Sequence, residues 1–196
     1  MKVIGITGGV GAGKSTVLAL LKELTSCVII MADDVAKTTT MPGGPAYDGV
    51  VKVLGEAVLD ADGSINRGRM ANIIFNNEAK KLAVEAIIHP VTKQLIKTMI
   101  EDAANKGIYE YTFVEAALLI EDNYDEICEE FWYVYVPEMQ RVTRLIESRN
   151  YSEEKCRDIM ANQLSDEQFR DHCAFVIDNS KTTEYTKSQL IYKLDK

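Results

Sequence analysis

The sequence predicts an α/β fold with a mainly parallel β-sheet. Apolar runs rich in Val, Ile, Phe and Tyr recur along the chain, and most lack the alternation of a half-exposed strand. Helical patterns separate these runs, and a glycine-rich turn follows the first of them. This alternation of strands and helices indicates a parallel sheet with helices on its faces. The predicted strands are residues 3–7, 27–31, 111–119, 131–136 and 174–177.

The predicted helices carry their apolar side chains on one face. Residues 14–24 and 79–87 both follow helical spacing, and an apolar stripe continues beyond Pro90. Ser152 is a predicted N-cap, because two glutamates follow it in what would be the first turn.

Two helical segments are too long to be ordinary connections between strands. Residues 34–108 separate the second and third predicted strands, and residues 138–172 form a second segment that is dense in arginine. Within the first segment, "TTTMPGGPAYDG" at 38–49 predicts a loop, because its Pro-Gly-Gly-Pro core supports neither a helix nor a strand.

The composition is typical of a soluble globular protein. Of the 196 residues, 46% are hydrophobic and 27% are charged, and the net charge is −8. The chain has no apolar run of the ~20 residues that span a bilayer and no leader-like N-terminus, so we expect a cytoplasmic protein that binds no membrane. The acidic balance argues against nucleic-acid binding. Four scattered cysteines without a C-x-x-C pair predict reduced, mostly buried thiols.

The glycine-rich turn predicts a phosphate-binding loop. "GGVGAGKS" at 8–15 matches G-x-x-x-x-G-K-[ST] and lies between a predicted strand and a predicted helix. Its backbone N–H groups and the following helix N-terminus would hold phosphate oxygens, Lys14 would reach the β- and γ-phosphates, and the Ser15 hydroxyl would bind Mg²⁺. A chance glycine turn is the alternative, and a random chain of this length shows the pattern on the order of once in a hundred cases. The predicted ATP-binding residues are Gly9, Val10, Gly11, Ala12, Gly13, Lys14, Ser15 and Thr16.

The loop alone does not define the reaction, but other features favour a small-molecule kinase. The chain lacks an Asn-Lys-x-Asp motif for guanine and is short for a motor protein. Two helical segments suit a kinase, since one would hold the acceptor and the other would close over the nucleotide. We therefore predict a P-loop kinase fold with a five-stranded parallel sheet. Its parts would be a nucleotide-binding core (1–33, 109–137 and 174–196), an acceptor-binding helical region (34–108) and a lid (138–173).

Two carboxylates follow the second predicted strand. Asp33 and Asp34 come directly after it, and ligands of open parallel sheets bind beyond this edge. A carboxylate here could accept the proton of an attacking hydroxyl or hold Mg²⁺ through water. The alternative is a helix N-cap, a position that Asp also favours.

From these residues onward, the sequence resembles the dephospho-CoA kinase family through nearly the whole chain. The order and spacing of the matching segments carry the resemblance. They are TGGVGAGKST at 7–16, MADDVAK at 31–37, PGGPA at 42–46, DGSINR at 62–67, His89-Pro90, ALLIE at 117–121, Gln163 and VIDN at 176–179.

The resemblance implies transfer of the ATP γ-phosphoryl group to the ribose 3′-hydroxyl of dephospho-CoA, which yields CoA in the last step of its synthesis. Asp33 would be the catalytic carboxylate, since it aligns with the second Asp of the family's Asp-Ala-Asp. The lid arginines Arg141, Arg144 and Arg149 would contact the phosphates, with Arg144 as the catalytic one. A solvated basic helix face is the alternative for any of them.

The resemblance also assigns residues beyond the loop and the lid. His89 would line the acceptor site, although a His before Pro is often structural. Arg67 and Lys93 are further acceptor-side candidates that could meet the pyrophosphate of dephospho-CoA. Asn179 would contact adenine or cap a turn.

Three positions depart from the family pattern. Met31 replaces the first Asp of Asp-Ala-Asp, Lys37 replaces an Arg and Ala117 replaces a Pro, and the lid arginines lie about one residue out of register.

Two other functions stay open: a kinase for nucleosides or nucleotides, and a nucleotide-binding regulator without turnover. We expect a monomer or a small homo-oligomer.

Overall fold

The computed structural model describes residues 1–116 and 118–195, so Ala117 lies outside the described residues. The chain forms two compact units. The first unit contains Met1–Ile30 and Ala103–Lys196, and the second contains Met31–Asp102. Each unit is described by itself.

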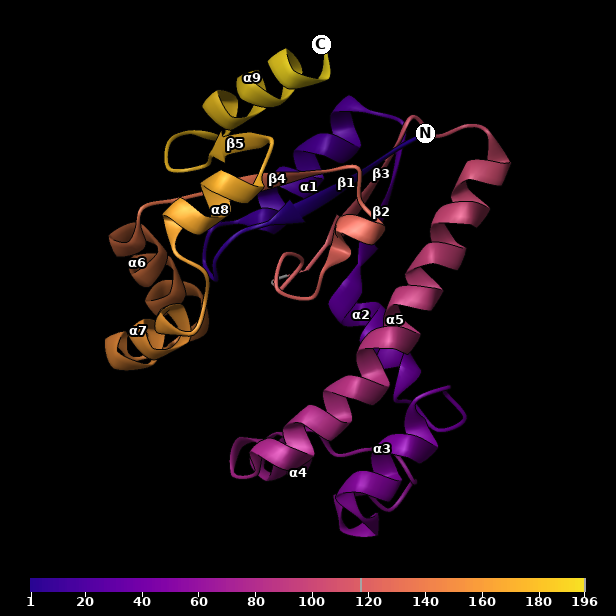
Figure 1. Cartoon of the computed structure of the whole chain (residues 1–196). Coiled ribbons are helices and arrows are strands. Elements are labelled where there is room, and N and C mark those ends of the chain that lie inside the picture. The colour runs from indigo at the N-terminus through magenta and orange to yellow at the C-terminus, as the bar shows by residue number, and fades with distance from the viewer. Residues whose placement is uncertain (117, 196) are drawn as a thin grey trace. The chain divides into compact units, whose positions relative to one another are not determined.

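The elements alternate as the sequence predicts (Figure 1). The strands are β1 Lys2–Thr7, β2 Cys27–Met31, β3 Tyr111–Glu115, β4 Glu130–Tyr135 and β5 Phe175–Asp178. The helices are α1 Lys14–Leu24, α2 Ala32–Thr39, α3 Tyr47–Leu54, α4 Arg67–Phe75, α5 Glu78–Lys106, α6 Glu138–Arg149, α7 Glu153–Ala161, α8 Asp166–His172 and α9 Thr183–Leu194. Two short 3-10 helices are η1 Glu56–Val58 and η2 Tyr124–Glu126.

The strands form a five-stranded sheet in the order β2-β3-β1-β4-β5. β1 lies at its centre and pairs in parallel with β3 and β4, while β4 pairs in parallel with β5. This arrangement confirms the predicted fold class. It also places the turn after β1 between the carboxyl ends of β3 and β4, where parallel sheets bind their ligands.

The third strand is shorter than the sequence predicts. β3 ends at Glu115, whereas the apolar run continues to Leu119. The pairing with β1 extends only to Ile6 and Glu115, because β1 ends one residue later and enters the glycine-rich turn. Leu119 is nevertheless fully buried in the turn that follows. The strand and Leu119 are apolar because they are buried, whereas Leu118 between them is 47% exposed, and only the first part of the run is extended.

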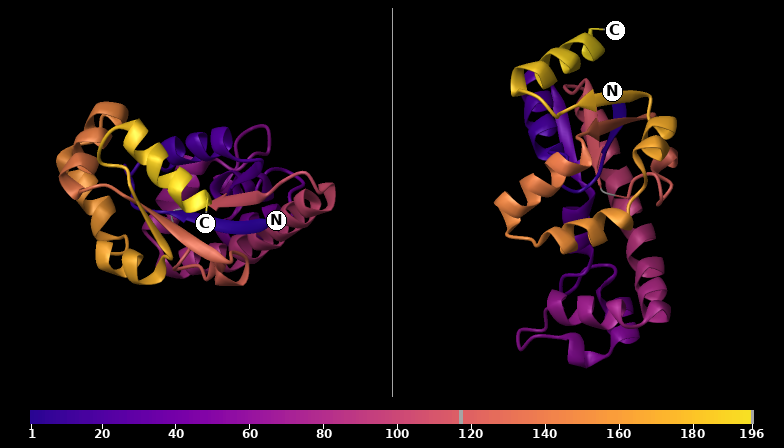
Figure 2. Two further views of the ribbon diagram at one scale, coloured as in Figure 1. Left: turned by 90° about the horizontal axis from the view of Figure 1, so that it is seen from above. Right: turned by 90° about the vertical axis from the view of Figure 1, so that its left-hand side faces the viewer.

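The core of the first unit lies on both faces of the sheet. Trp132 and Phe113 are fully buried, with ring centroids 5.8 Å apart, and Phe175 meets the edge of Trp132 at 5.5 Å. The helices α1 and α9 contact each other on one face of the sheet, and α8 lies on the other (Figure 2). Burial on both faces explains why the strands read as continuous apolar runs.

The second unit has a small core of its own. Val50 and Leu54 of α3 pack with Val84 of α5, and apolar side chains of α4 cover this cluster. α4 begins at an N-cap whose side chain, Asn66, accepts a hydrogen bond from the Arg69 N–H at 2.9 Å. The predicted loop at 38–49 is confirmed in its centre, while its ends belong to α2 and α3.

Two further expectations concern helices. Ser152 caps α7, since its side chain accepts a hydrogen bond from the Lys155 N–H. Pro90 lies inside the single 29-residue helix α5, although a proline in a helix interior typically costs about 3 kcal/mol. Among the described residues, we find no helix with the length and apolarity that a bilayer span requires.

Candidate active site

The turn between β1 and α1 has the backbone that a phosphate cradle needs. Gly11 and Gly13 have φ angles of 79° and 82°, in the left-handed region that favours glycine. α1 then begins at Lys14 and has no acidic residue in its own first turn. Ser15 and Thr16 are exposed beside it. The turn therefore presents backbone donors and a helix N-terminus to an anion.

Lys14 folds back over the turn in this structure. Its Nζ donates a hydrogen bond to the Gly8 carbonyl at 2.9 Å and lies 3.5 Å from Glu115 Oε1. Both side chains are largely buried, with 15% of Lys14 and 10% of Glu115 exposed. Glu115 ends β3, directly beside β1, and this position places its carboxylate next to the turn.

Two side chains of the 138–173 segment pack directly on the glycine-rich turn. Gln163 Oε1 accepts a hydrogen bond from the Val10 N–H at 3.0 Å. The guanidinium of Arg141, on α6, lies so close to Gly9 that a Cβ there would overlap its Nη1. A side chain at position 9 would displace the guanidinium, so the glycine there lets Arg141 lie against the turn.

Arg144 lies one helical turn after Arg141 and reaches the other end of the glycine-rich turn. Its Nη2 donates to the Asn179 carbonyl at 2.9 Å, and its Nη1 would lie 3.5 Å from a Cβ on Gly13. Arg149 is the exposed last residue of α6, about 12 Å from Arg141 along the helix axis. The structure therefore brings two of the three predicted arginines to the turn.

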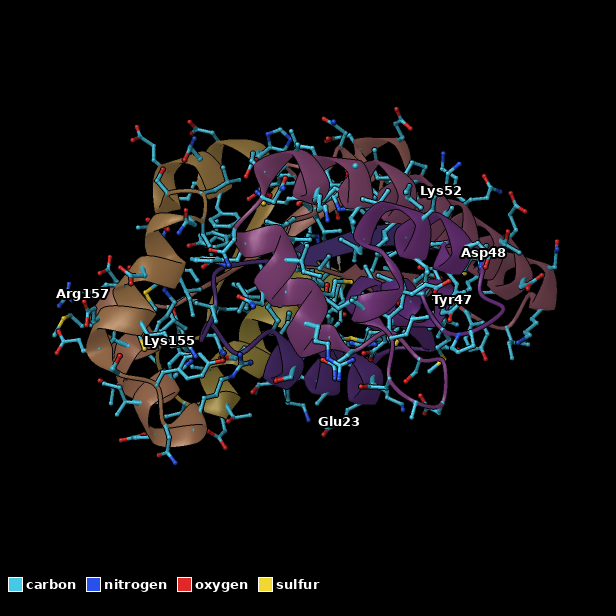
Figure 3. The ribbon with its side chains drawn as sticks, turned by 90° about the horizontal axis from the view of Figure 1, so that it is seen from below. Glu23, Tyr47, Asp48, Lys52, Lys155 and Arg157 are labelled. Atoms are coloured by element: carbon cyan, nitrogen blue, oxygen red, sulfur yellow. The ribbon has the colours of Figure 1, made fainter. Side chains whose placement is uncertain are left out.

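Two other cationic side chains of the 138–173 segment, Lys155 and Arg157, contact residues within that segment. Arg157 pairs with Glu153 at 2.7 Å and with Glu138 at 3.7 Å, which joins α7 to the start of α6. Lys155 lies over the Tyr151 ring at 3.8 Å. Figure 3 labels both residues on these helices, with Arg157 at their outer edge.

Tyr133 of β4 connects α8 to the region around the glycine-rich turn. Tyr133 lies opposite Thr7 in the sheet and stacks on Phe169 at 4.7 Å. Burial, and then the Asp166 carboxylate that accepts its hydrogen bond, raise the pKa of Tyr133, while the nearby Arg141 opposes them. The phenol is therefore neutral at physiological pH and serves as a hydrogen-bond donor.

Asn179 is buried against the glycine-rich turn. Its Nδ2 donates to the Ala12 carbonyl at 2.8 Å, and its Oδ1 accepts from the Thr186 hydroxyl at 2.9 Å. Both ends of the carboxamide are thus engaged within the protein. This geometry favours the interpretation that Asn179 supports the turn.

The second unit contains a pocket of about 740 Å³. Asp33 and Lys37 of α2 line it together with Arg67 of α4, and apolar side chains such as Met70 and Ile88 complete its wall. With Asp60, four charged groups lie beside apolar surface, which suits a ligand that is partly ionic and partly apolar. His89 and Lys93 lie four residues apart on α5 and are not among the described residues that line this pocket.

Asp33 does not cap α2. The N-cap is Met31, which makes no side-chain capping bond, and Asp33 lies in the first turn with its side chain exposed. The N-cap alternative for Asp33 is therefore wrong. Asp34 bonds Lys37 at 2.5 Å, so the lysine that replaces the family arginine pairs with its own helix.

The dephospho-CoA kinase family model matches residues 2–184. The chain belongs to this family. The dephospho-CoA kinase of Carboxydothermus hydrogenoformans is 34% identical over 196 residues, which cover 100% of this chain and 94% of that protein. The prediction of a kinase, made from the loop and the family resemblance, is confirmed.

Solved structures share the fold of this dephospho-CoA kinase family member. The structure of TT1252 from Thermus thermophilus matches with a TM-score of 0.83 and 25% identity, covering 98% of this chain and 95% of that one. A dephospho-CoA kinase from Campylobacter jejuni matches with a TM-score of 0.73 and 20% identity, covering 100% and 96%. A shikimate kinase from Acinetobacter baumannii, with a TM-score of 0.57, shares the fold at 17% identity.

Sequence reasoning missed Glu115 as a site residue. The only local signal is an acidic residue at the end of an apolar run, and that run was expected to continue to Leu119. The contact with Lys14 depends on β3 lying beside β1, which is a property of the sheet order. Gln163 was part of the family resemblance without a role, and the structure gives it a contact with the P-loop.

The four cysteines are free thiols. Cys128 and Cys156 are buried, and Cys27 and Cys173 are half-buried. Burial raises the pKa of Cys128 and of Cys173 to about 12, so neither thiol is a thiolate at neutral pH. Cys128 therefore behaves as a small apolar residue of the core.

Proposed function

We propose that the protein transfers the γ-phosphoryl group of ATP to the ribose 3′-hydroxyl of dephospho-CoA. The observation that carries the proposal is the complete phosphate loop, with Lys14 held between Gly8 and Glu115, in a chain whose family match covers residues 2–184. The 3′-oxygen forms a bond to the γ-phosphorus, and the bond from that phosphorus to the ADP oxygen breaks. The hydroxyl proton leaves to a base.

On the nucleotide side, the P-loop and the start of α1 provide donors for the β- and γ-phosphates. Lys14 would exchange the Gly8 carbonyl for a phosphate oxygen. Ser15 and Glu115 offer the oxygen ligands that Mg²⁺ prefers, and they would hold the ion against the phosphates. Bound Mg²⁺ would neutralise charge that develops on the transferred group.

The lid residues would act on the same phosphates. Arg141 lies against the P-loop and Arg144 bonds Asn179 beside it, and each would place a guanidinium against the triphosphate, with Arg144 as the catalytic arginine. Arg149 stays a predicted nucleotide contact, which it would make only after a movement of α6. Asn179 would contribute by holding the loop.

On the acceptor side, the pocket of the second unit would bind part of dephospho-CoA. Asp33 would orient the 3′-hydroxyl and accept its proton. Arg67 and Lys37 line the same pocket and would meet anionic groups of the acceptor, although Lys37 lacks the bidentate geometry of an arginine. His89 and Lys93 stay predicted acceptor contacts on one face of α5.

A substitution of Glu115 tests the Mg²⁺ assignment. Glu115→Gln keeps the size of the side chain but removes the charge that would face the ion. We expect the Mg²⁺ concentration for half-maximal rate to rise about 10- to 100-fold. The measurement is the initial rate against total Mg²⁺ at saturating ATP. Glu110 is exposed and directly precedes the first residue of β3, at the other end of the strand from Glu115. Glu110→Gln is therefore the matched control, and it should leave the Mg²⁺ dependence unchanged.

The function itself is tested with the purified protein, ATP, Mg²⁺ and dephospho-CoA. Mass spectrometry should show the gain of one phosphate, and ³¹P NMR should place it on the 3′-hydroxyl. Parallel reactions contain a nucleoside, a nucleotide or shikimate as the acceptor. Faster phosphorylation of one of these acceptors would replace the proposal with another small-molecule kinase. ATP binding without ADP formation from any acceptor would favour a regulator.

A further inference from the structure

Two polar side chains of α9 hold the segment that follows β5. Thr186 and Gln189 lie three residues apart, so both face the same side of the helix. The Gln189 carboxamide bonds the backbone of Asp178 twice, accepting from its N–H at 3.0 Å and donating to its carbonyl at 2.9 Å. Thr186 is fully buried and donates to Asn179 Oδ1 at 2.9 Å.

Asn179 connects this helix to the P-loop and to the lid. Its side chain donates to the Ala12 carbonyl at 2.8 Å, and its own carbonyl accepts from Arg144 at 2.9 Å. A Cβ on Gly13 would lie 2.5 Å from Asn179 Nδ2, so the carboxamide lies directly against the loop backbone. Asn179 is 6% exposed, and the exchange of these partners for water is therefore costly.

The two ends of the carboxamide cannot exchange places. The Ala12 carbonyl can only accept a hydrogen bond, so the NH₂ group must face it and the oxygen must face Thr186. The Thr186 hydroxyl satisfies that oxygen. Without the hydroxyl, a buried acceptor would lack this donor, and the carboxamide would lose one of the two side-chain hydrogen bonds that hold its present orientation.

The contact with Ala12 sets the direction of a donor in the loop. The peptide between Ala12 and Gly13 is planar and trans, so its C=O and N–H point in opposite directions. When Asn179 holds the carbonyl, the Gly13 N–H must point away from Asn179. That N–H belongs to the loop that would surround the phosphates.

We propose that Thr186 is a positioning residue for the P-loop, acting through Asn179 on the Ala12–Gly13 peptide. It lies beyond residue 184, where the family match ends, and it touches neither the loop nor a phosphate by itself. The proposal rests on nucleotide binding by the loop, which is part of the proposed function. With the hydroxyl in place the loop is organised before ATP arrives, whereas without it ATP binding must bear the cost of ordering the loop.

The test measures the Kd for ATP by titration calorimetry, without an acceptor, in three variants. Thr186→Val keeps the shape and removes the hydroxyl, and we expect its Kd to rise about tenfold. Thr186→Ser restores the hydroxyl and should bring the Kd back to within about threefold of the native value. Thr182→Ala is the matched control, because Thr182 caps the same helix through the Tyr185 N–H but does not touch Asn179 with its side chain.

The control separates positioning from helix stability. We expect Thr182→Ala to lower the melting temperature and leave the Kd for ATP unchanged. The proposal fails if Thr186→Val binds ATP as the native protein does, or if Thr182→Ala weakens binding to the same extent. If Thr186→Val does not fold, Thr186→Cys replaces it, and its Kd should exceed that of Thr186→Ser because a thiol is a weak donor.

The same titration distinguishes failure of this proposal from failure of the proposed function. A native protein that binds ATP without phosphorylating dephospho-CoA would overturn the acceptor assignment and leave the Thr186 comparison decisive. A native protein that binds no ATP would overturn both. Steady-state kinetics add a second readout, since a positioning defect in the loop should raise the KM for ATP more than it lowers kcat.

Discussion

Replacement of Lys14 by alanine should lower the turnover about 10³-fold and weaken ATP binding. The ammonium is the only side-chain cation of the loop itself, and it would neutralise charge on the oxygens between the β- and γ-phosphorus. Loss of one preorganised donor at a site of developing charge typically costs 10²–10³ in rate. The substitution also removes a partner of the largely buried Glu115 carboxylate, so some loss of stability should accompany it.

Lys22→Ala is the matched control for Lys14→Ala. Lys22 lies on the same helix, in its last turn, and is exposed, so its removal changes the net charge equally without touching the loop. Both variants are compared by the Kd for ATP, by kcat and by thermal unfolding. An unchanged Kd in Lys14→Ala would contradict the placement of Lys14 at the phosphates. A similar loss of ATP affinity and turnover in Lys22→Ala would show that the effect of Lys14→Ala comes from the change in net charge.

Local sequence information was sufficient for the loop and the helix after it. The predicted helix 14–24 has the bounds of α1, because the glycines before it and the apolar spacing within it act over a few residues. The end of β3 could not be predicted in this way, since apolar residues continue beyond the strand to the buried Leu119. Only the point where β1 turns away determines where pairing stops.

The contacts that organise the site join residues far apart in the sequence, and for this reason they could not be predicted from local patterns. Asn179 and Ala12 are 167 residues apart, and Val10 and Gln163 are 153 apart. The sequence predicted that Asn179 contacts adenine or caps a turn, and neither alternative includes its bond to the loop. The register of the lid arginines was uncertain by one residue. The structure selects Arg141 and Arg144 because helical spacing turns both toward the loop.

Replacement of Asp33 by asparagine should lower kcat by about 10²–10⁴ and leave the Kd for ATP unchanged. Asparagine has the size of aspartate but cannot take the proton of the 3′-hydroxyl, which is the contribution of a general base. Within the described residues, the Asp33 carboxylate forms no hydrogen bond or ion pair, whereas Lys37 donates a hydrogen bond to Asp34. The variant should therefore keep its fold and its nucleotide affinity while it loses transfer.

Asp34→Asn is the control that makes this result specific. Both aspartates lie in the first turn of α2, so each variant loses a similar favourable interaction with the helix dipole, and this contribution cancels in the comparison. We expect Asp34→Asn to keep most of its kcat, since Asp33 lines the pocket of the second unit and Asp34 does not. ADP release and ATP titration measure the two quantities. A kcat above a tenth of the native value in Asp33→Asn would contradict the role of Asp33 as a general base. Phosphoryl transfer would then depend on positioning and charge neutralisation alone.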